Sequence, residues 1–203
     1  MTMRISDEDR WHQWSTWYST ARADVATLVG NRSTWTNLEA VLSETGDSRL
    51  RESASWVSLA YIQMQFLGVT RQCDRTGRRA TLGCLLREMS LRPEIASRWS
   101  TQGPIVAQAE EAARFSDRTE FLIGDAHQIA GAVVAADVDM LNRETAAARA
   151  LAKRPTISAD VRDTSQAAVK QRDRAHIDRA VDVLQRLITK YGGLFDSAHP
   201  LFP

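Results

Sequence analysis

Apolar residues recur every three or four positions along most of the chain, which is the period of one face of an α-helix. The first such run follows the acidic residues Asp7–Asp9, which favour a helix N-terminus, and continues to Leu28. We expect Gly30-Asn31 to end this helix and Gly192-Gly193 to end the last one. The last helix has the clearest pattern in the chain, made by Ile177, Ala180, Val181, Leu184, Leu187, Ile188 and Tyr191.

Between these two helices the pattern predicts a short helix around Trp35 and Leu38 and a central helix from Arg49 to Arg71. Apolar stripes cover two faces of the central helix, so we expect it to pack on two sides. The stripes are Ala54, Val57, Tyr61 and Met64, and Trp56, Leu59, Phe66 and Leu67. A charged loop, 74–79, and a short helix, 80–89, follow the central helix.

Pro93 opens a turn, and Gly103-Pro104 is predicted to begin another short helix. A long Ala-rich helical stretch then runs from a possible cap at Asp117 to about Lys153, and Pro155 breaks it. The pattern as a whole predicts an all-α fold, an up-and-down antiparallel helical bundle. We expect a single domain, 1–203, with a short C-terminal tail, 194–203.

The composition is that of a globular protein, with 43% hydrophobic and 25% charged residues. The 26 basic and 25 acidic residues leave a net charge of +1, so any site for a polyanion has to be a local patch. The polar N-terminus lacks the apolar core of a signal peptide, and no apolar run approaches the ~20 residues of a membrane helix. We therefore expect a cytoplasmic protein that does not enter a membrane.

Common catalytic and cofactor motifs are missing from the sequence, including CxxC, HExxH, GxxxxGK[ST] and GxSxG. His12, His127, His176 and His199 lie on separate segments, so we expect no metal site and no cofactor. Cys73 and Cys84 have no Cys/His cluster around them and are expected to be small packing residues in a reducing compartment.

Three blocks of sequence resemble the AbiU2-like branch of the HEPN superfamily. The first is WSTWYSTARADVATL, 14–28, and the third is AHIDRAVDVLQRLITKYGGLF, 175–195. The second and most specific is TRQCDRTGRRATLGCLLREMSLRPEI, 70–95, in which an Arg and an Asp end a central helix before a short loop and a Leu-rich helix. The resemblance implies a compact HEPN-like bundle of four or five helices that dimerises.

Active members of that superfamily are metal-independent endoribonucleases, many of them toxins or phage-defence effectors, and they use an Arg-x(4–6)-His motif. The His serves as general acid and base, and the Arg stabilises the charge of the phosphorane. No histidine of this chain has an Arg at that spacing. Ser158 stands about where the His belongs, after Pro155, and it cannot titrate near neutral pH. We therefore expect the nuclease chemistry to be lost.

Arg172 and His176 form the only remaining pair that resembles this catalytic motif. They are four residues apart and would share a helix face, so they are candidate catalytic residues of a remodelled endoribonuclease. The alternative is a surface Arg and a His beside the apolar stripe.

The densest basic cluster comprises Arg71, Arg75, Arg78, Arg79 and Arg87, with Asp74 among them. These arginines are candidate contacts for RNA phosphates, because guanidinium groups bind phosphate in a bidentate, salt-sensitive way. The alternative is a solvated loop in which Asp74 is a structural polar residue that pairs with Arg71 to fix the turn.

Six Trp residues and the wide apolar stripes suggest that part of the apolar surface lies between protomers. Together with the resemblance, they lead us to expect a homodimer. RNA and an antitoxin or other defence protein are further possible partners. A structural helical protein unrelated to HEPN is the other reading of the same pattern.

Overall fold

The computed structural model describes residues 5–44, 48–76, 79–102, 130–152 and 165–196. This part of the chain is helical and contains no strand, which confirms the all-α prediction. Its helices are α1 (Asp7–Glu44), α2 (Ser48–Gln72), α3 (Leu82–Leu91), α4 (Pro93–Gln102), α6 (Gly131–Ala152) and α7 (Ser165–Asp196). The helix expected at Gly103-Pro104, the cap at Asp117 and the break at Pro155 lie outside the described residues.

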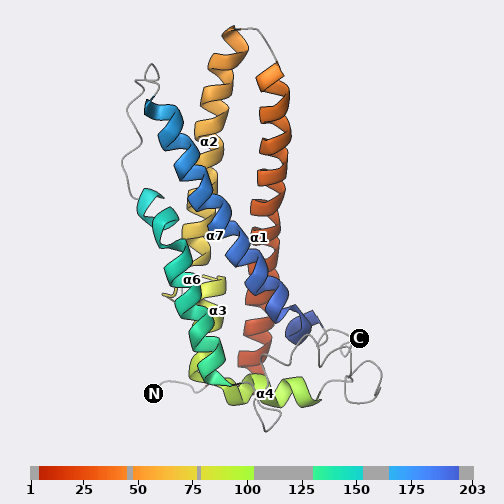
Figure 1. Ribbon diagram of the computed structural model, residues 1–203. Coiled ribbons are helices and arrows are strands. Elements are labelled where there is room, and N and C mark those ends of the chain that lie inside the picture. Colours follow the sequence, from red (N-terminus) through yellow and green to blue (C-terminus); the bar gives the residue numbers. More distant parts are fainter. Residues whose placement is uncertain (1–4, 45–47, 77–78, 103–129, 153–164, 197–203) are drawn as a thin grey trace.

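The long helices run side by side, and α3 and α4 lie toward one end of the molecule (Figure 1). Helices α1 and α2 form an antiparallel hairpin, and α6 and α7 form a second antiparallel pair that packs against it. As expected, the first and central helices pack together, and the closing helix packs against the core. None of the described helices is both long enough and apolar enough to cross a membrane.

Helix α1 does not end at Gly30-Asn31 as predicted but continues to Glu44, so the short helix expected around Trp35 is its second half. Trp35 is 5% exposed and stacks on Tyr61 of α2, with 5.3 Å between the ring centroids. Burying such a side chain contributes roughly 1.5–3 kcal/mol, which exceeds the ~1 kcal/mol cost of one glycine inside a helix.

Helix α3 begins and ends with defined caps. The Thr81 hydroxyl accepts a hydrogen bond from the Cys84 N–H at 3.2 Å, which satisfies one of the unpaired donors at the helix start. Arg92 caps the C-terminus, and Pro93 is the first residue of α4, where its missing N–H costs nothing.

Helix α7 forms the centre of the core, and the apolar residues predicted for it are all buried. It also passes through Gly192-Gly193 and ends at Asp196, so the predicted tail starts too early. Leu194 and Phe195 belong to the core, and the Phe195 ring stacks on Trp11 and Tyr18 at centroid distances of 5.1 and 4.7 Å. These contacts outweigh the helix-ending preference of two glycines.

Helix α2 packs on one side only against the other described helices. Tyr61, Ile62, Gln65, Phe66 and Val69 are buried against the other helices. The opposite face exposes Trp56 (58%), Val57 (45%), Met64 (54%) and Leu67 (64%). No other described element lies over this face, so among the described residues the expected packing of α2 on two sides is not found.

Candidate functional site

Arg172 and His176 both lie on α7, one turn apart. His176 is half-buried and adjoins the buried residues Ile177 and Ala180, while the side chain of Arg172 is outside the described part. The other described histidine, His12, is on α1 next to Trp11, which stacks on Phe195 at the far end of α7. Phe195 is 19 residues from His176, roughly 28 Å along a helix, so one chain does not bring these two histidines together.

The described residues of the loop between α2 and α3 are hydrogen-bonded within the loop and to both helix ends. Asp74 accepts hydrogen bonds from the Thr76 N–H and hydroxyl at 2.9 and 3.1 Å, and the first of these is the main reason that the pKa of Asp74 lies below its usual value. The Asp74 carbonyl in turn accepts the Thr81 hydroxyl at 2.6 Å, and the Gln72 side chain accepts the Leu82 N–H at 3.1 Å. Asp74 thus has a structural role.

Asp74 does not pair with Arg71, however, and that part of the sequence prediction is wrong. The Arg71 guanidinium lies 3.4 Å from Asp24 of α1, and Asp24 also accepts a 2.7 Å hydrogen bond from the Gln72 amide. Only the backbone links Arg71 to the loop, since its carbonyl accepts the Asp74 N–H at 3.0 Å.

Three arginines surround this loop without a described carboxylate partner in contact. Arg75, Arg79 and Arg87 are all exposed, and the Arg87 guanidinium donates to the Arg75 carbonyl at 3.0 Å. Arg79 is close enough to Asp74 to help lower the pKa of that carboxyl. Arg78, the fourth arginine predicted here, lies outside the described residues. Arg75, Arg79 and Arg87 of the predicted cluster thus lie on or beside the described part of the loop, and Arg71 lies at the end of α2.

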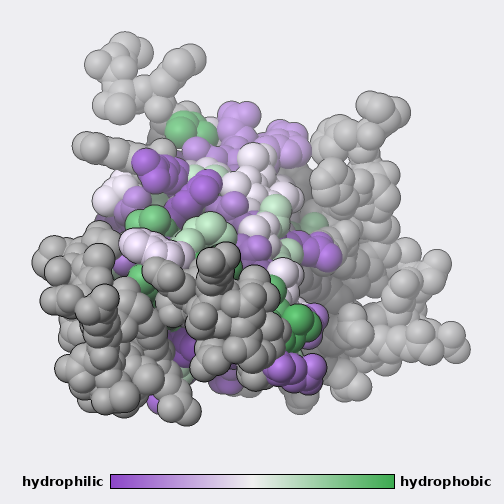
Figure 2. Space-filling model, turned by 90° about the horizontal axis from the view of Figure 1, so that it is seen from above, coloured by the Kyte–Doolittle hydropathy of each residue, from purple (hydrophilic) through white to green (hydrophobic). Residues whose placement is uncertain are grey.

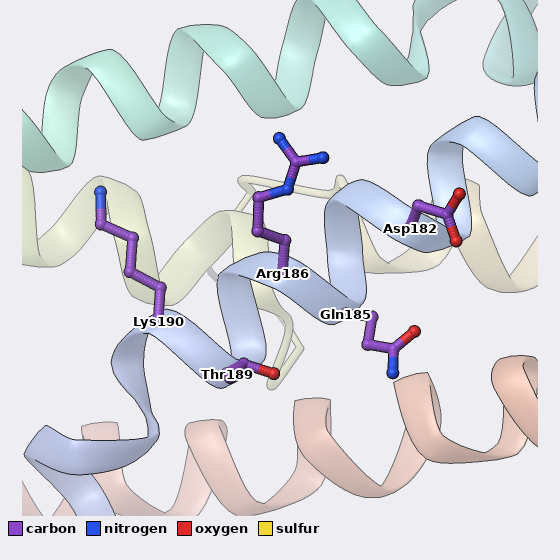
Figure 3. Close-up of a pocket in the computed structure, with 5 residues that line it drawn as sticks. All are labelled: Asp182, Gln185, Arg186, Thr189 and Lys190. Atoms are coloured by element: carbon purple, nitrogen blue, oxygen red, sulfur yellow. The ribbon is translucent and has the colours of Figure 1, made fainter. Parts of the chain in front are cut away.

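A shallow groove of about 650 Å³ runs between α6 and α7. Arg143, Glu144, Asp178, Arg179, Asp182 and Arg186 supply its charged lining. A second hollow is lined by α7 residues from Asp182 to Lys190, and the Arg186 and Lys190 side chains point toward α6 (Figure 3). Nothing in the sequence pattern marked this groove, because its residues come from helices far apart in the chain.

Most charges of the groove are already compensated. Glu144 accepts hydrogen bonds from Arg143 at 3.0 Å and from Arg179 at 2.6 Å, and these contacts lower the pKa of the carboxyl. Asp182 binds Arg32 of α1 at 2.5 Å. Three arginines against three carboxylates leave the groove without a charge that would select a ligand class.

Two further polar groups are buried between helices. Asp137 of α6 accepts hydrogen bonds from the Lys190 ammonium at 2.5 Å and from the Tyr191 hydroxyl at 2.7 Å. Burial and the nearby Asp137 raise the pKa of Tyr191, so its hydroxyl remains a donor. This network connects α6 to α7, and its residues are more than 50 positions apart in sequence, which is why the sequence gave no sign of it.

Both cysteines are buried thiols, as expected for packing residues. The Cys73 sulfur lies 3.2 Å from the Thr145 hydroxyl, and the Cys84 sulfur donates to the Asp74 carbonyl at 3.3 Å. Within the described ranges, no group of three or more His, Cys, Asp or Glu side chains is placed to hold a metal ion.

The exposed apolar face of α2 is the other surface of note. Trp56, Ala60, Met64 and Leu67 follow one another at steps of four, four and three residues, and all four are exposed. No charged residue occurs between Glu52 and Arg71, although a quarter of the chain is charged. Hydrophobic residues also interrupt the hydrophilic surface where the molecule is viewed from the end at which α1 and α2 are joined (Figure 2).

Comparisons of the chain with protein-family models, curated proteins and solved structures found no match.

Proposed function

We propose that this protein is a HEPN-like helical module that acts by binding, without catalysis, and that it forms a homodimer through the exposed apolar face of α2. The observation that carries the proposal is this face: it has no charge over 18 residues, yet it exposes a Trp, a Met and a Leu by more than half. A solvated helix face normally carries charged residues, and large exposed apolar patches mark interaction sites.

The composition of the face favours a second copy of the chain over a different protein. Homodimer interfaces are more apolar than other interfaces and are enriched in aromatic residues and Met. The spacing is also self-complementary, because Trp56 and Met64 are each four residues from Ala60. In an antiparallel two-fold crossing at Ala60, Trp56 of one protomer would lie on Met64 of its partner, and the small Ala60 side chains would allow the helices to approach closely.

Leu38 of α1 extends this face. It is 37% exposed and lies three residues beyond Trp35, while Val57 lies four residues before the Tyr61 that stacks on Trp35. In the antiparallel hairpin the Leu38 and Val57 side chains therefore lie at similar levels along the helix axes. A surface built from both helices comes closer to the ~800 Å² per protomer that a stable interface buries than one helix does alone.

The link to phage defence or a toxin–antitoxin-type system rests on the resemblance of segments 70–95 and 175–195 to the AbiU2-like branch. The bundle of antiparallel helices is compatible with that assignment. Finding the gene beside a minimal nucleotidyltransferase or within a defence cluster would support this part of the proposal. An antitoxin or other defence protein would then be a further partner.

The test of dimerisation is light scattering on the unmodified protein and on Leu67→Glu and Leu91→Glu. The two leucines are equally exposed, at 64%, but Leu91 is at the end of α3. At high micromolar concentration we expect twice the 22.7 kDa chain mass for the unmodified protein and for Leu91→Glu, and the monomer mass for Leu67→Glu. A monomeric unmodified protein, or a Leu67→Glu variant that stays dimeric, would contradict the proposal.

A further inference from the structure

The arginine corner, defined as Arg75, Arg79 and Arg87 around the α2–α3 loop, concentrates positive charge in a chain of almost balanced charge. Several other described arginines have carboxylate partners: Arg10 with Glu88, Arg32 with Asp182, Arg98 with Asp7, Arg174 with Glu39 and Arg179 with Glu144. At this corner Asp74 is hydrogen-bonded to Thr76 and lies near Arg79, while Asp24 is bound by Arg71 and Gln72. The three guanidinium groups are exposed and outnumber the single Asp74 carboxylate, so the corner keeps a net positive charge.

The corner is also preorganised. The Arg87 guanidinium is fixed on the Arg75 carbonyl, so one cation of α3 is held directly against the loop that carries another. Among the described loop residues, Asp74 is bonded to Thr76 and Thr81. A bound anion would attract each of these cations. A rigid arrangement also reduces the ordering cost of binding.

We propose that the arginine corner binds phosphate groups, and that these belong to the backbone of a single-stranded nucleic acid. Guanidinium groups match phosphate oxygens in a bidentate geometry. The three cations lie on an exposed surface rather than in an enclosed cavity, which suits successive phosphates of a chain. Neither the corner nor the described part of the loop carries an aromatic side chain for base stacking, so the binding is independent of base sequence. This site does not depend on the α2 face.

The experiment compares two triple variants with the same change in net charge. The first is Arg75→Gln with Arg79→Gln and Arg87→Gln, and the control is Arg143→Gln with Arg179→Gln and Arg186→Gln in the α6–α7 groove. All six side chains are exposed, so both variants are expected to fold, which thermal unfolding checks. Fluorescence anisotropy with labelled 12-nucleotide homopolymers of two different bases measures binding between about 50 and 200 mM salt.

We expect the unmodified protein and the control to bind both homopolymers, with a log–log salt slope of about −2, which corresponds to three phosphate contacts on a single strand. The corner variant should lose about tenfold or more in affinity and most of the slope. Equal binding by the two variants, no binding by the unmodified protein, or preference for one homopolymer would overturn the proposal. Titration with inorganic pyrophosphate separates the two sources of phosphate: binding of pyrophosphate without the polymer would retain the phosphate site and assign it to a small ligand.

Discussion

At the scale of single residues, Asp178 stands out because its surroundings disfavour its charge. Burial raises the pKa of this carboxyl, the nearby Asp182 adds to the effect, and Arg32 and Arg174 oppose it without cancelling it. The folded state therefore holds the proton more tightly than the unfolded state does. Above the ordinary pKa of 3.8, ionisation of Asp178 lowers the free energy of unfolding. This loss reaches its full size once the pH passes the raised pKa of the folded state.

Replacing this carboxyl should therefore stabilise the protein at neutral pH only. For Asp178→Asn we expect a higher melting temperature at pH 7 and no increase at pH 3, where both states are protonated. Asp182→Asn is the matched control, since Asp182 lies one turn further along α7 but is 55% exposed and paired with Arg32. Thermal unfolding followed by circular dichroism measures both. A rise that is equal at the two pH values would show that burial of the charge is not the cause.

Residue-scale chemistry was predictable from sequence only where it is local. The arginine corner and the structural role of Asp74 follow from neighbours within the segment 71–87. The partner of Arg71 did not follow, because Asp24 is 47 residues away on another helix. Asp137, Lys190 and Tyr191 were missed for the same reason. Periodicity places residues on a helix face, but it does not say which faces meet.

At the scale of helices, packing decides where an element ends when it conflicts with local preference. The periodic apolar residues of α7 were identified correctly from sequence, whereas of the two stripes expected to be covered on α2 only Tyr61 and Phe66 are buried. The ends at Gly30-Asn31 and Gly192-Gly193 were not identified correctly, because Trp35 and Phe195 lie just beyond them and are buried. A glycine costs about 1 kcal/mol within a helix, which is less than a buried aromatic ring contributes. Sequence alone does not reveal that burial.

Two glycine substitutions within helices are expected to change the stability of the protein in opposite directions. At Gly30 a new Cβ would meet no atom within 4 Å, so Gly30→Ala should raise the free energy of unfolding by about 0.5–1 kcal/mol. At Gly83 the Cβ would lie 2.9 Å from the Asp74 carbonyl oxygen and 3.0 Å from the Cys73 carbonyl group, all of them backbone atoms. Gly83→Ala should therefore lower the free energy of unfolding by roughly 1–3 kcal/mol. Urea unfolding measures both, and destabilisation by Gly30→Ala would indicate that α1 is interrupted there.

At the scale of the whole molecule, the two proposed surfaces lie at different places on α2. The apolar face centres on Ala60, and the arginine corner begins just beyond Gln72, where the helix ends. Ala60 and Arg75 are 15 residues apart, roughly 22 Å if the whole interval had helical rise. Dimerisation through the middle of α2 would thus leave both corners of the dimer accessible. A dimer could engage a nucleic-acid strand at two points, which strengthens binding without any new contact.

Binding of a nucleic acid does not make the protein a nuclease, and we predict no robust metal-independent cleavage of RNA. Cleavage through the 2′-hydroxyl needs a group that exchanges a proton near neutral pH and a fixed cation for the phosphorane charge. In the described part, the histidines that could exchange the proton are His12 of α1 and His176 of α7. His12 adjoins Trp11, which stacks on Phe195, and Phe195 lies 19 residues, roughly 28 Å along a helix, from His176. His176 has Arg172 one turn away, closer in sequence than any spacing of the HEPN motif.

The decisive assay incubates structured RNA and tRNA with the unmodified protein and with His176→Ala in EDTA. We expect the RNA to remain intact with both proteins at concentrations where the arginine corner is saturated. The corner variant serves as a second control. Cleavage by a contaminating nuclease would persist both in His176→Ala and in the corner variant. Cleavage by the unmodified protein that disappears in His176→Ala would contradict the prediction. It would instead favour a remodelled endoribonuclease in which two protomers bring Arg172 and His176 to a shared cleft.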